Sequence, residues 1–202
     1  FDYIESLGGR AVMTSDKHER ASDRCAEALI TLEKEEEKKY QIVVMVQGDE
    51  PMTQPAMISE AVKPMLEDSS ILVVNLLGQI SSTEELESPN CIKVVCDLQG
   101  NALYFSREAI PTRSKTNQIH FGKQVCIIPF IRDFLLEYTK MAPTPLEIVE
   151  SVDMLRVLEH GRKVKMVPTK YNTVAVDTEL DRQRVEKLLK DDPTTSIYCN
   201  FK

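Results

Sequence analysis

The chain has no apolar run that approaches the roughly 20 residues needed to span a bilayer. It also lacks a positively charged, apolar signal segment at its start. Internal repeats, low-complexity tracts and an obvious linker are absent as well. The composition is ordinary for a globular protein: of the 202 residues, 42% are hydrophobic and 28% are charged. This composition indicates a globular protein with one sizeable core.

Positive charge is scarce. The chain carries 25 Lys and Arg against 32 Asp and Glu, which gives a net charge of -7. Because nucleic-acid phosphates are bound by basic faces, this balance argues against nonspecific nucleic-acid binding. Any phosphate ligand is therefore expected to be small, and to be held by local cations, a metal ion or backbone amides.

The cysteines give no support for disulfide pairing. There are five, an odd number, and no Cys-x-x-Cys motif occurs. Cys25, Cys96 and Cys126 lie in apolar segments and are predicted to be buried thiols; the others are Cys91 and Cys199. Unpaired thiols favour a cytoplasmic location.

Strand-like and helix-like segments alternate along the chain, which predicts an α/β fold. We expect strands at 11–13, 42–46, 71–77, 92–96, 102–105, 125–128 and 164–167, with a hairpin turn at 97–101. We expect helices at 22–39, 55–66, 131–140, 146–159 and 179–189, with Ser22 as the N-cap of the first. The chain is thus predicted to form a single domain, 1–202, with a β-rich insertion at about 90–130.

The most informative stretch is Gln47-Gly48-Asp49-Glu50-Pro51, which follows the apolar run Ile42–Val46. A mostly β-branched run without polar alternation is typical of a strand buried on both faces, as in a parallel sheet. Asp49 and Glu50 then lie at the carboxyl end of the strand, where open α/β sheets bind ligands. Asp177 follows a second apolar segment in a similar way. Two carboxylates at two strand ends indicate a hard-cation site, most commonly for magnesium with a nucleotide.

Several motifs occur together and in order along nearly the whole chain. They are Met13-Thr14-Ser15, Ser22-Asp23-Arg24, Gln47-Gly48-Asp49-Glu50-Pro51, Tyr104-Phe105-Ser106-Arg107, Ile110-Pro111, Leu155-Arg156-Val157-Leu158-Glu159-His160-Gly161 and Val176-Asp177-Thr178. Each is weak alone, but their combination resembles the 3-deoxy-manno-octulosonate cytidylyltransferase (CMP-Kdo synthetase) family. The resemblance implies an α/β, nucleotide-diphospho-sugar transferase-like fold, with a mostly parallel sheet flanked by helices. It also implies a homodimer formed through the inserted β region, and a role in lipopolysaccharide biosynthesis.

In this family, the anomeric hydroxyl of a sugar acid attacks the α-phosphorus of CTP and pyrophosphate leaves. The resemblance implies that Asp49 and Asp177 are the catalytic residues and ligate Mg²⁺, which offsets negative charge and aligns the phosphoryl oxygens. Arg107 is expected to bind the sugar carboxylate with its planar fork. The other residues expected to contact the substrates are Ser22, Arg24, Gln47, Gln124 and Asp153.

These assignments have structural alternatives. Asp49 and Asp177 could be turn residues at strand ends, although the ordered pair favours the metal role. For Arg24, a cation on the helix surface and a contact to phosphate or sugar are about equally favoured. Arg107 could pair with a neighbouring carboxylate on the sheet, and Gln47 could cap its own turn.

The sequence departs from the family pattern in two places. The family begins with a strand and a glycine-containing loop, rich in Arg and Lys, that cradles the CTP phosphates; these 202 residues contain no such loop. We expect it to precede Phe1 in a longer protein, which leaves the activity of this chain alone open. In the sugar pocket, Gln124 and Ile128 replace the family's histidine and tyrosine, and Asp153-Met154 replaces its Glu-Gln pair. We therefore hypothesise an acceptor related to Kdo that is modified or less polar.

Two other functions stay open at this point. The same fold and carboxylates could serve another nucleotidyltransferase, or a glycosyltransferase that releases no pyrophosphate. A non-catalytic nucleotide-sugar-binding homologue is supported by the missing phosphate loop, but opposed by the presence of both Asp49 and Asp177. The expected partners are CTP, a sugar acid and a second copy of the chain, with no nucleic acid or membrane.

Overall fold

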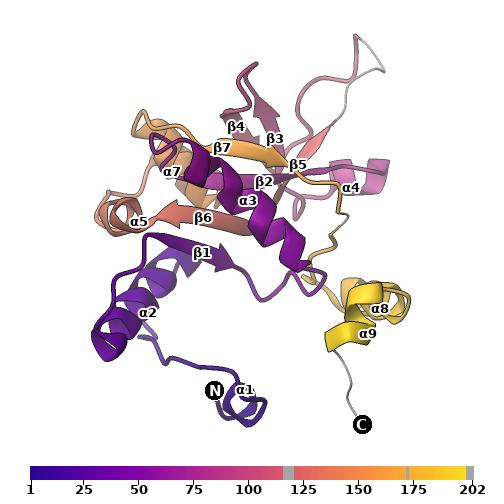
Figure 1. Cartoon of the computed structure of the whole chain (residues 1–202). Coiled ribbons are helices and arrows are strands. Elements are labelled where there is room, and N and C mark those ends of the chain that lie inside the picture. Colours follow the sequence, from indigo (N-terminus) through magenta and orange to yellow (C-terminus); the bar gives the residue numbers. More distant parts are fainter. Residues whose placement is uncertain (116–120, 172, 199–202) are drawn as a thin grey trace.

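The computed structural model describes residues 1–115, 121–171 and 173–198. Its strands form one sheet of two strands and one of five (Figure 1). The two-stranded sheet pairs β1 (Ile42–Val46) with β6 (Ile127–Ile131). The five-stranded sheet has the order β4-β3-β5-β2-β7. Its strands are β2 (Val74–Gln79), β3 (Lys93–Cys96), β4 (Ala102–Ser106), β5 (Gly122–Val125) and β7 (Lys165–Pro168).

The two sheets are connected by a bend at Cys126. β5 ends just before this residue and β6 begins just after it. Before the bend the chain pairs with β2, and after it the chain pairs with β1. A bridge between Val73 and Phe130 keeps β6 close to the start of β2. The sequence predicts one strand at 125–128, but the structure has two because the pairing partner changes at Cys126.

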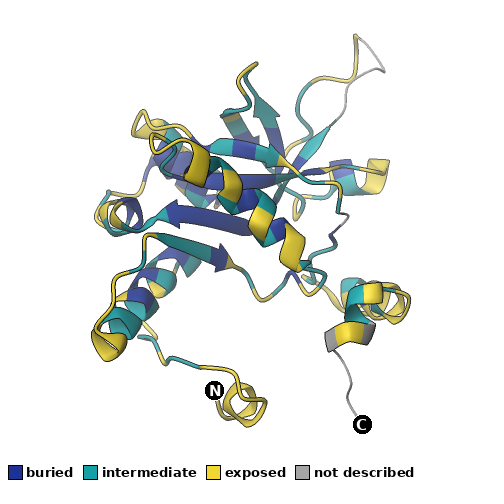
Figure 2. Cartoon of the chain, in the orientation of Figure 1, coloured by how far each residue is buried: buried dark blue, intermediate teal, exposed yellow. Residues whose placement is uncertain are grey.

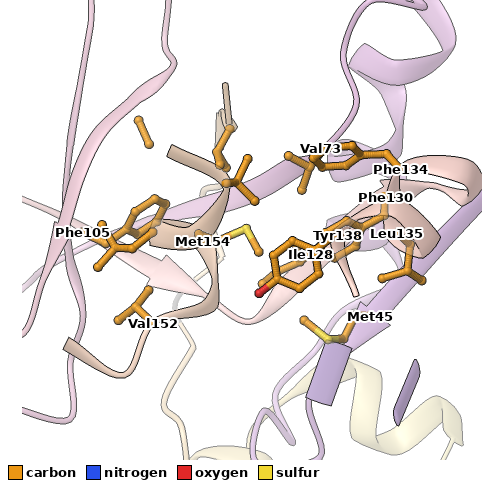
Figure 3. Close-up of a cluster of buried hydrophobic side chains, with 14 of the residues drawn as sticks. Met45, Val73, Phe105, Ile128, Phe130, Phe134, Leu135, Tyr138, Val152 and Met154 are labelled. Carbon is orange, nitrogen blue, oxygen red and sulfur yellow. The ribbon is translucent and has the colours of Figure 1, made fainter. Parts of the chain in front are cut away.

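Helices cover both faces of this bent sheet (Figure 1). On one face, α3 (Pro55–Glu67) buries an apolar stripe against β2, β5 and β6. On the other, a larger core involves α2 (Ala21–Glu36), α5 (Arg132–Tyr138) and α7 (Asp153–Glu159). Figure 3 shows Tyr138 and Met154 of this core close to Ile128, and Figure 2 shows β6 almost entirely buried. The remaining helices are α1 (Asp2–Ser6), α4 (Thr83–Glu87), α6 (Pro145–Glu150), α8 (Glu179–Lys190) and α9 (Pro193–Tyr198).

Several predicted elements are confirmed. β1 has its predicted bounds, α3 begins at the expected proline, and α8 covers the predicted closing helix. β3 and β4 form the predicted antiparallel hairpin, and β2, α5 and β7 lie in their expected segments with shifted ends. Residues 11–13, predicted as a strand, form none. None of the described helices is both long and apolar enough to cross a membrane.

The first long helix differs from its prediction at both ends. α2 begins at Ala21 with Arg20 as its N-cap, so the prediction of Ser22 as N-cap is wrong. The Ser22 side chain is fully buried and bonds to a distant carboxylate instead. The helix ends at Glu36, because Glu37 adopts the left-handed conformation with φ 50°.

The α/β class is confirmed, but the sheet is mixed and not mostly parallel. Among the described strands only β2 and β7 pair in parallel, and the other four ladders are antiparallel. β1 is also less covered than a strand buried on both faces, since only Met45 is buried and Val46 is 39% exposed. An apolar run predicts a strand but not the direction of its partner. Segment 90–130 supplies β3, β4 and β5, and its description as an insertion stays a prediction.

The predicted helix at 146–159 is in fact two helices, α6 and α7. Ser151 between them is left-handed, with φ 52° and ψ 51°. A buried pair fixes the break: Arg156 Nη2 lies 2.6 Å from Glu147 Oε1, and its Nε lies 2.7 Å from Glu147 Oε2. In one straight helix, residues nine positions apart would be separated by about 13 Å along the axis. The buried ion pair therefore requires the bend that the helical spacing does not reveal.

The bend predicts opposite effects for two substitutions of Ser151. Ser151→Val should lower the free energy of unfolding by about 1–2 kcal/mol, because β-branched residues fit the left-handed region poorly. Ser151→Gly should leave stability unchanged or raise it. Urea denaturation followed by circular dichroism measures both, and equal stability of the two variants would contradict a strained turn.

Candidate active site

The turn after β1 is bonded to the bend at Cys126. Gln47 N–H donates to the Cys126 carbonyl at 3.2 Å, and Cys126 N–H donates to Glu50 Oε1 at 3.3 Å. Glu50 N–H closes the turn by donating to the Gln47 carbonyl at 3.2 Å. Glu50 is only 6% exposed; burial raises its pKa and the Asp49 charge adds to this, while the Cys126 N–H and Lys123 oppose it. The acid-bearing turn is thus fixed where the sheet bends.

The two aspartates predicted as catalytic lie together. Val176 N–H donates to the Asp49 carbonyl at 2.9 Å, so Asp177 directly follows a residue bonded to Asp49. Asp177 is exposed, yet partial loss of hydration and then the Asp49 charge raise its pKa, while Arg107 acts in the opposite direction. Asp49 Oδ1 is buried and has no hydrogen-bond partner within the residues that the structure describes. A lone buried oxygen beside a second carboxylate is an arrangement that a cation can satisfy.

The donors of this pair are all oxygen atoms, which suits a hard cation. Within 1–115, 121–171 and 173–198, no three His, Cys, Asp or Glu side chains form a group that could hold a metal ion. Magnesium commonly takes one or two protein carboxylates and fills its other positions with water and substrate phosphates. The two aspartates therefore fit Mg²⁺ better than a metal that needs a complete protein cage.

Lys123 connects the sheet to the segment 173–177, which leads to Asp177. Its side chain is 8% exposed, and its Nζ donates to the Thr173 carbonyl at 2.8 Å. The same ammonium forms an ion pair with Glu85 of α4. Because Lys123 belongs to β5, these contacts hold the chain that leads to Asp177 against the sheet and against α4.

Ser22 and Asp153, both predicted to bind substrate, are bonded to each other. Ser22 Oγ donates to Asp153 Oδ2 at 2.9 Å, and Arg20 Nη1 lies 3.3 Å from Asp153 Oδ1. Burial raises the pKa of Asp153, while Ser22 and Arg20 oppose the change. The bond joins the first turn of α2 to the first residue of α7, so two helix starts converge here.

Cys126 marks the centre of the site. Its thiol pKa is raised by burial and then by four carboxylates, which are Glu50, Asp49, Asp153 and Asp177 in decreasing order of effect. These acids come from three segments that are distant in sequence. Like Cys25 and Cys96, Cys126 is half-buried and not fully buried as predicted; Cys199 lies outside the described residues.

Arg107 lies at the end of β4 and is half-buried. Its guanidinium donates to the carbonyls of Glu150 at 2.6 Å, Pro89 at 2.7 Å and Ser151 at 3.4 Å. Within the described part of the chain, no carboxylate forms an ion pair with it. The alternative that Arg107 pairs with a carboxylate on the sheet is therefore not supported.

The other predicted binding residues are held by nearby groups. The exposed Arg24 donates to Thr14 Oγ1 at 2.7 Å and to two carbonyls of the loop before α2. Gln124 Nε2 donates to Oδ1 of the fully buried Asn75 at 2.6 Å. Gln47 contributes its backbone to the turn, as described above. For all three, a contact with substrate stays a prediction.

Several residues that build the site were not predicted from the sequence. Lys93 and Lys123 are buried ammonium groups inside strands, and Glu150 and Cys126 contact or surround predicted site residues. Lys93 lies inside the predicted apolar strand 92–96, and this was an available signal, since a lysine is rarely buried without partners. Lys123 lies before the predicted strand 125–128 and gave no such signal. No comparable signal singles out Glu150 or Cys126.

Comparison with known sequences gives close matches over most of the chain. A family model described as cytidylyltransferase matches residues 1–164. The 3-deoxy-manno-octulosonate cytidylyltransferase of Geotalea uraniireducens (strain Rf4) is 43% identical over 198 residues, which cover 93% of this chain and 76% of that protein. The protein of the same name from Fusobacterium nucleatum subsp. nucleatum is 36% identical over 191 residues, covering 95% and 76%.

Solved structures give a consistent fold. A CMP:2-keto-3-deoxy-manno-octonic acid synthetase complexed with CTP matches with a TM-score of 0.82 and 29% identity, over 94% of this chain and 76% of that chain. A putative glucose-1-phosphate thymidylyltransferase from Bacillus anthracis, in complex with a sucrose, matches with a TM-score of 0.58 and 12% identity. It covers 95% of this chain and 72% of that one, and at this identity it bears on the fold alone. The predicted nucleotide-diphospho-sugar transferase-like fold is confirmed.

The clustered acids predict that Asp177→Asn stabilises the ligand-free protein at pH 7. A carboxyl with a raised folded-state pKa contributes most to stability below its unfolded pKa of about 4, and less as the pH rises through the folded-state value. Asparagine cannot ionise, so the variant does not lose this stability as the pH rises. The urea midpoint of the variant should therefore exceed that of the wild type at pH 7, and the difference should vanish at about pH 3.5.

Asp133→Asn is the matched control, because that side chain is 86% exposed and lies in α5. It should give no gain at pH 7. A gain for Asp177→Asn that is the same at both pH values would rule out charge repulsion as its cause.

Proposed function

The chain belongs to the 3-deoxy-manno-octulosonate cytidylyltransferase family, and on that premise we propose that it transfers CMP from CTP to Kdo and releases pyrophosphate. The observation that carries the proposal is the 2.9 Å bond from Val176 N–H to the Asp49 carbonyl, which brings two distant acids to one point. Such a point is what this reaction needs. A triphosphate must accept an attacking oxygen carried by an anionic sugar, so negative charge has to be offset.

We propose that Asp49 and Asp177 hold Mg²⁺. The unpartnered, buried Oδ1 of Asp49 supports this role, as does the all-oxygen donor set. When bound, Mg²⁺ would neutralise charge on the phosphoryl oxygens and orient them toward the attacking hydroxyl. The protein's part is to fix the two carboxylates in advance: the Cys126 bend holds the Asp49 turn, and Lys123 holds the chain before Asp177.

The sugar is proposed to bind on the side of Arg107 and the Ser22–Asp153 pair. Arg107 is a permanently charged donor suited to a sugar carboxylate. Asp153 and Ser22 offer oxygen atoms that can bond to sugar hydroxyls, and their mutual bond fixes their orientation. Gln124, where the family has a histidine, keeps a polar group in this region, oriented by Asn75.

The hypothesis of a modified or less polar acceptor stays a prediction, and the names of the relatives favour Kdo itself. A comparison of kcat/KM for Kdo and for deoxygenated analogues tests it. We also propose a homodimer and a cytoplasmic location, as in the resemblance; mass photometry of the purified protein tests the first.

Asp49→Asn tests the proposed chemistry. Neutralising one of two metal ligands should lower the rate of CTP-dependent pyrophosphate release by at least about 100-fold, which is the loss typical of removing a group that stabilises transition-state charge. The variant should keep the wild-type circular dichroism spectrum, because Asp49 Oδ1 has no bond to lose within the described residues.

Asp133→Asn, an exposed acid on α5, is the control and should keep full activity. Near-normal pyrophosphate release by Asp49→Asn would contradict the proposal that Asp49 binds Mg²⁺. Turnover with Kdo but without pyrophosphate would instead point to a glycosyltransferase.

A further inference from the structure

Three hydrogen bonds hold the guanidinium of Arg107, and two of its N–H groups have no partner among the described residues. A guanidinium has five N–H groups. The carbonyls of Glu150, Pro89 and Ser151 take one each from Nε, Nη1 and Nη2. Within the described residues no other partner takes the remaining N–H of Nη1 or of Nη2. These two N–H groups, one on each Nη atom, can donate to a carboxylate.

Glu150 bonds to three donors at the end of β4, next to this guanidinium. Its Oε2 accepts the Arg107 N–H at 2.8 Å, and its Oε1 accepts the hydroxyls of Ser106 at 2.9 Å and Tyr104 at 3.1 Å. Burial alone would raise the pKa of Glu150, but these bonds outweigh it and lower the pKa. A single residue thus bonds both the backbone and, through its own carbonyl, the guanidinium of Arg107.

Lys93 also holds Arg107, through its backbone carbonyl. This fully buried residue of β3 donates from Nζ to the carbonyls of Ser88 at 2.8 Å and Cys91 at 2.7 Å, and to the carbonyl of Arg107. Ser88 and Cys91 flank Pro89, whose carbonyl binds Nη1 of Arg107. The backbone and the side chain of Arg107 are therefore held by contacts of both Glu150 and Lys93.

We propose that Glu150 is a positioning residue for substrate binding: it directs the two free N–H groups of Arg107 to the carboxylate of the sugar acid without touching the sugar itself. This rests on the proposed function, because it takes the acceptor to be an acid bound by Arg107. The break between α6 and α7 would then serve to free two backbone carbonyls for Arg107. In a continuous helix the carbonyls of Glu150 and Ser151 would bond to N–H groups four residues later. The left-handed Ser151 leaves both for Arg107.

A double-mutant cycle tests the proposal. Glu150→Gln, Arg107→Lys and the double variant are compared with the wild type for KM of Kdo, KM of CTP and kcat. Glu150→Gln should raise the KM for Kdo about tenfold, as expected when charged hydrogen bonds weaken, with the KM for CTP changed less than about twofold. The double variant should lose little beyond Arg107→Lys, because both changes act on the same guanidinium.

Two further measurements separate positioning from general support. A Kdo analogue with a carboxamide in place of the carboxylate should be discriminated against by the wild type and much less by Glu150→Gln. Glu137→Gln, which removes a carboxylate from an exposed pair with Arg162, is the control and should change no constant. If Glu150→Gln does not fold, Tyr104→Phe removes one bond to the same carboxylate and should shift the KM for Kdo in the same direction.

The outcomes distinguish the two proposals. A full-length wild type that releases no pyrophosphate with CTP and Kdo refutes the proposed function, and the positioning role with it. An active wild type with an unchanged KM for Kdo in Glu150→Gln and in Tyr104→Phe refutes only the positioning role. Equal losses for both substrates, or additive effects in the cycle, would refute it too, since they mean that Glu150 merely stabilises the fold.

Discussion

The site depends on holding two acid-bearing segments together against their own repulsion. A backbone bond from Val176 to Asp49 joins them, and the pKa of Asp177 is raised by partial loss of hydration and then by the Asp49 charge. Two features oppose the repulsion: Lys123 bonds to the chain at Thr173, and the positive charge of Arg107 acts to lower the pKa of Asp177. The protein thus maintains a concentration of negative charge that a divalent cation would relieve. The two aspartates therefore lower the stability of the fold at the place where the ion is proposed to bind.

Cations around this site bind backbone carbonyls more than carboxylates. Lys93 and Arg107 together bond to six carbonyl oxygens, and Lys123 bonds to one besides its pair with Glu85. A carbonyl fixes the position of a cation without cancelling its charge. The arrangement therefore keeps positive charge available near the acids, whereas the buried Arg156–Glu147 pair is neutral overall and serves to bend the chain.

The predictable part of the molecule is local. The apolar run at 42–46 gave β1 with its bounds, and the order of motifs led to Asp49 and Asp177, which the structure brings together. What failed depends on distant partners. Helical spacing at 146–159 could not reveal a break fixed by Arg156 and Glu147, and Ser22 looked like a cap because its partner, Asp153, lies 131 positions away. The antiparallel pairing of β1 likewise depends on β6, far along the chain. Glu150 carries no local signal, since its role arises only once the helix is broken.

The central claim is that Asp49 and Asp177 bind one divalent ion together. Anomalous diffraction from crystals grown with Mn²⁺ and CTP tests it most directly, because it locates the ion independently of activity. The account predicts a single strong peak within bonding distance, about 2.1 Å, of a carboxylate oxygen from each aspartate. A peak that touches only one of them, or that lies elsewhere in the chain, would contradict it.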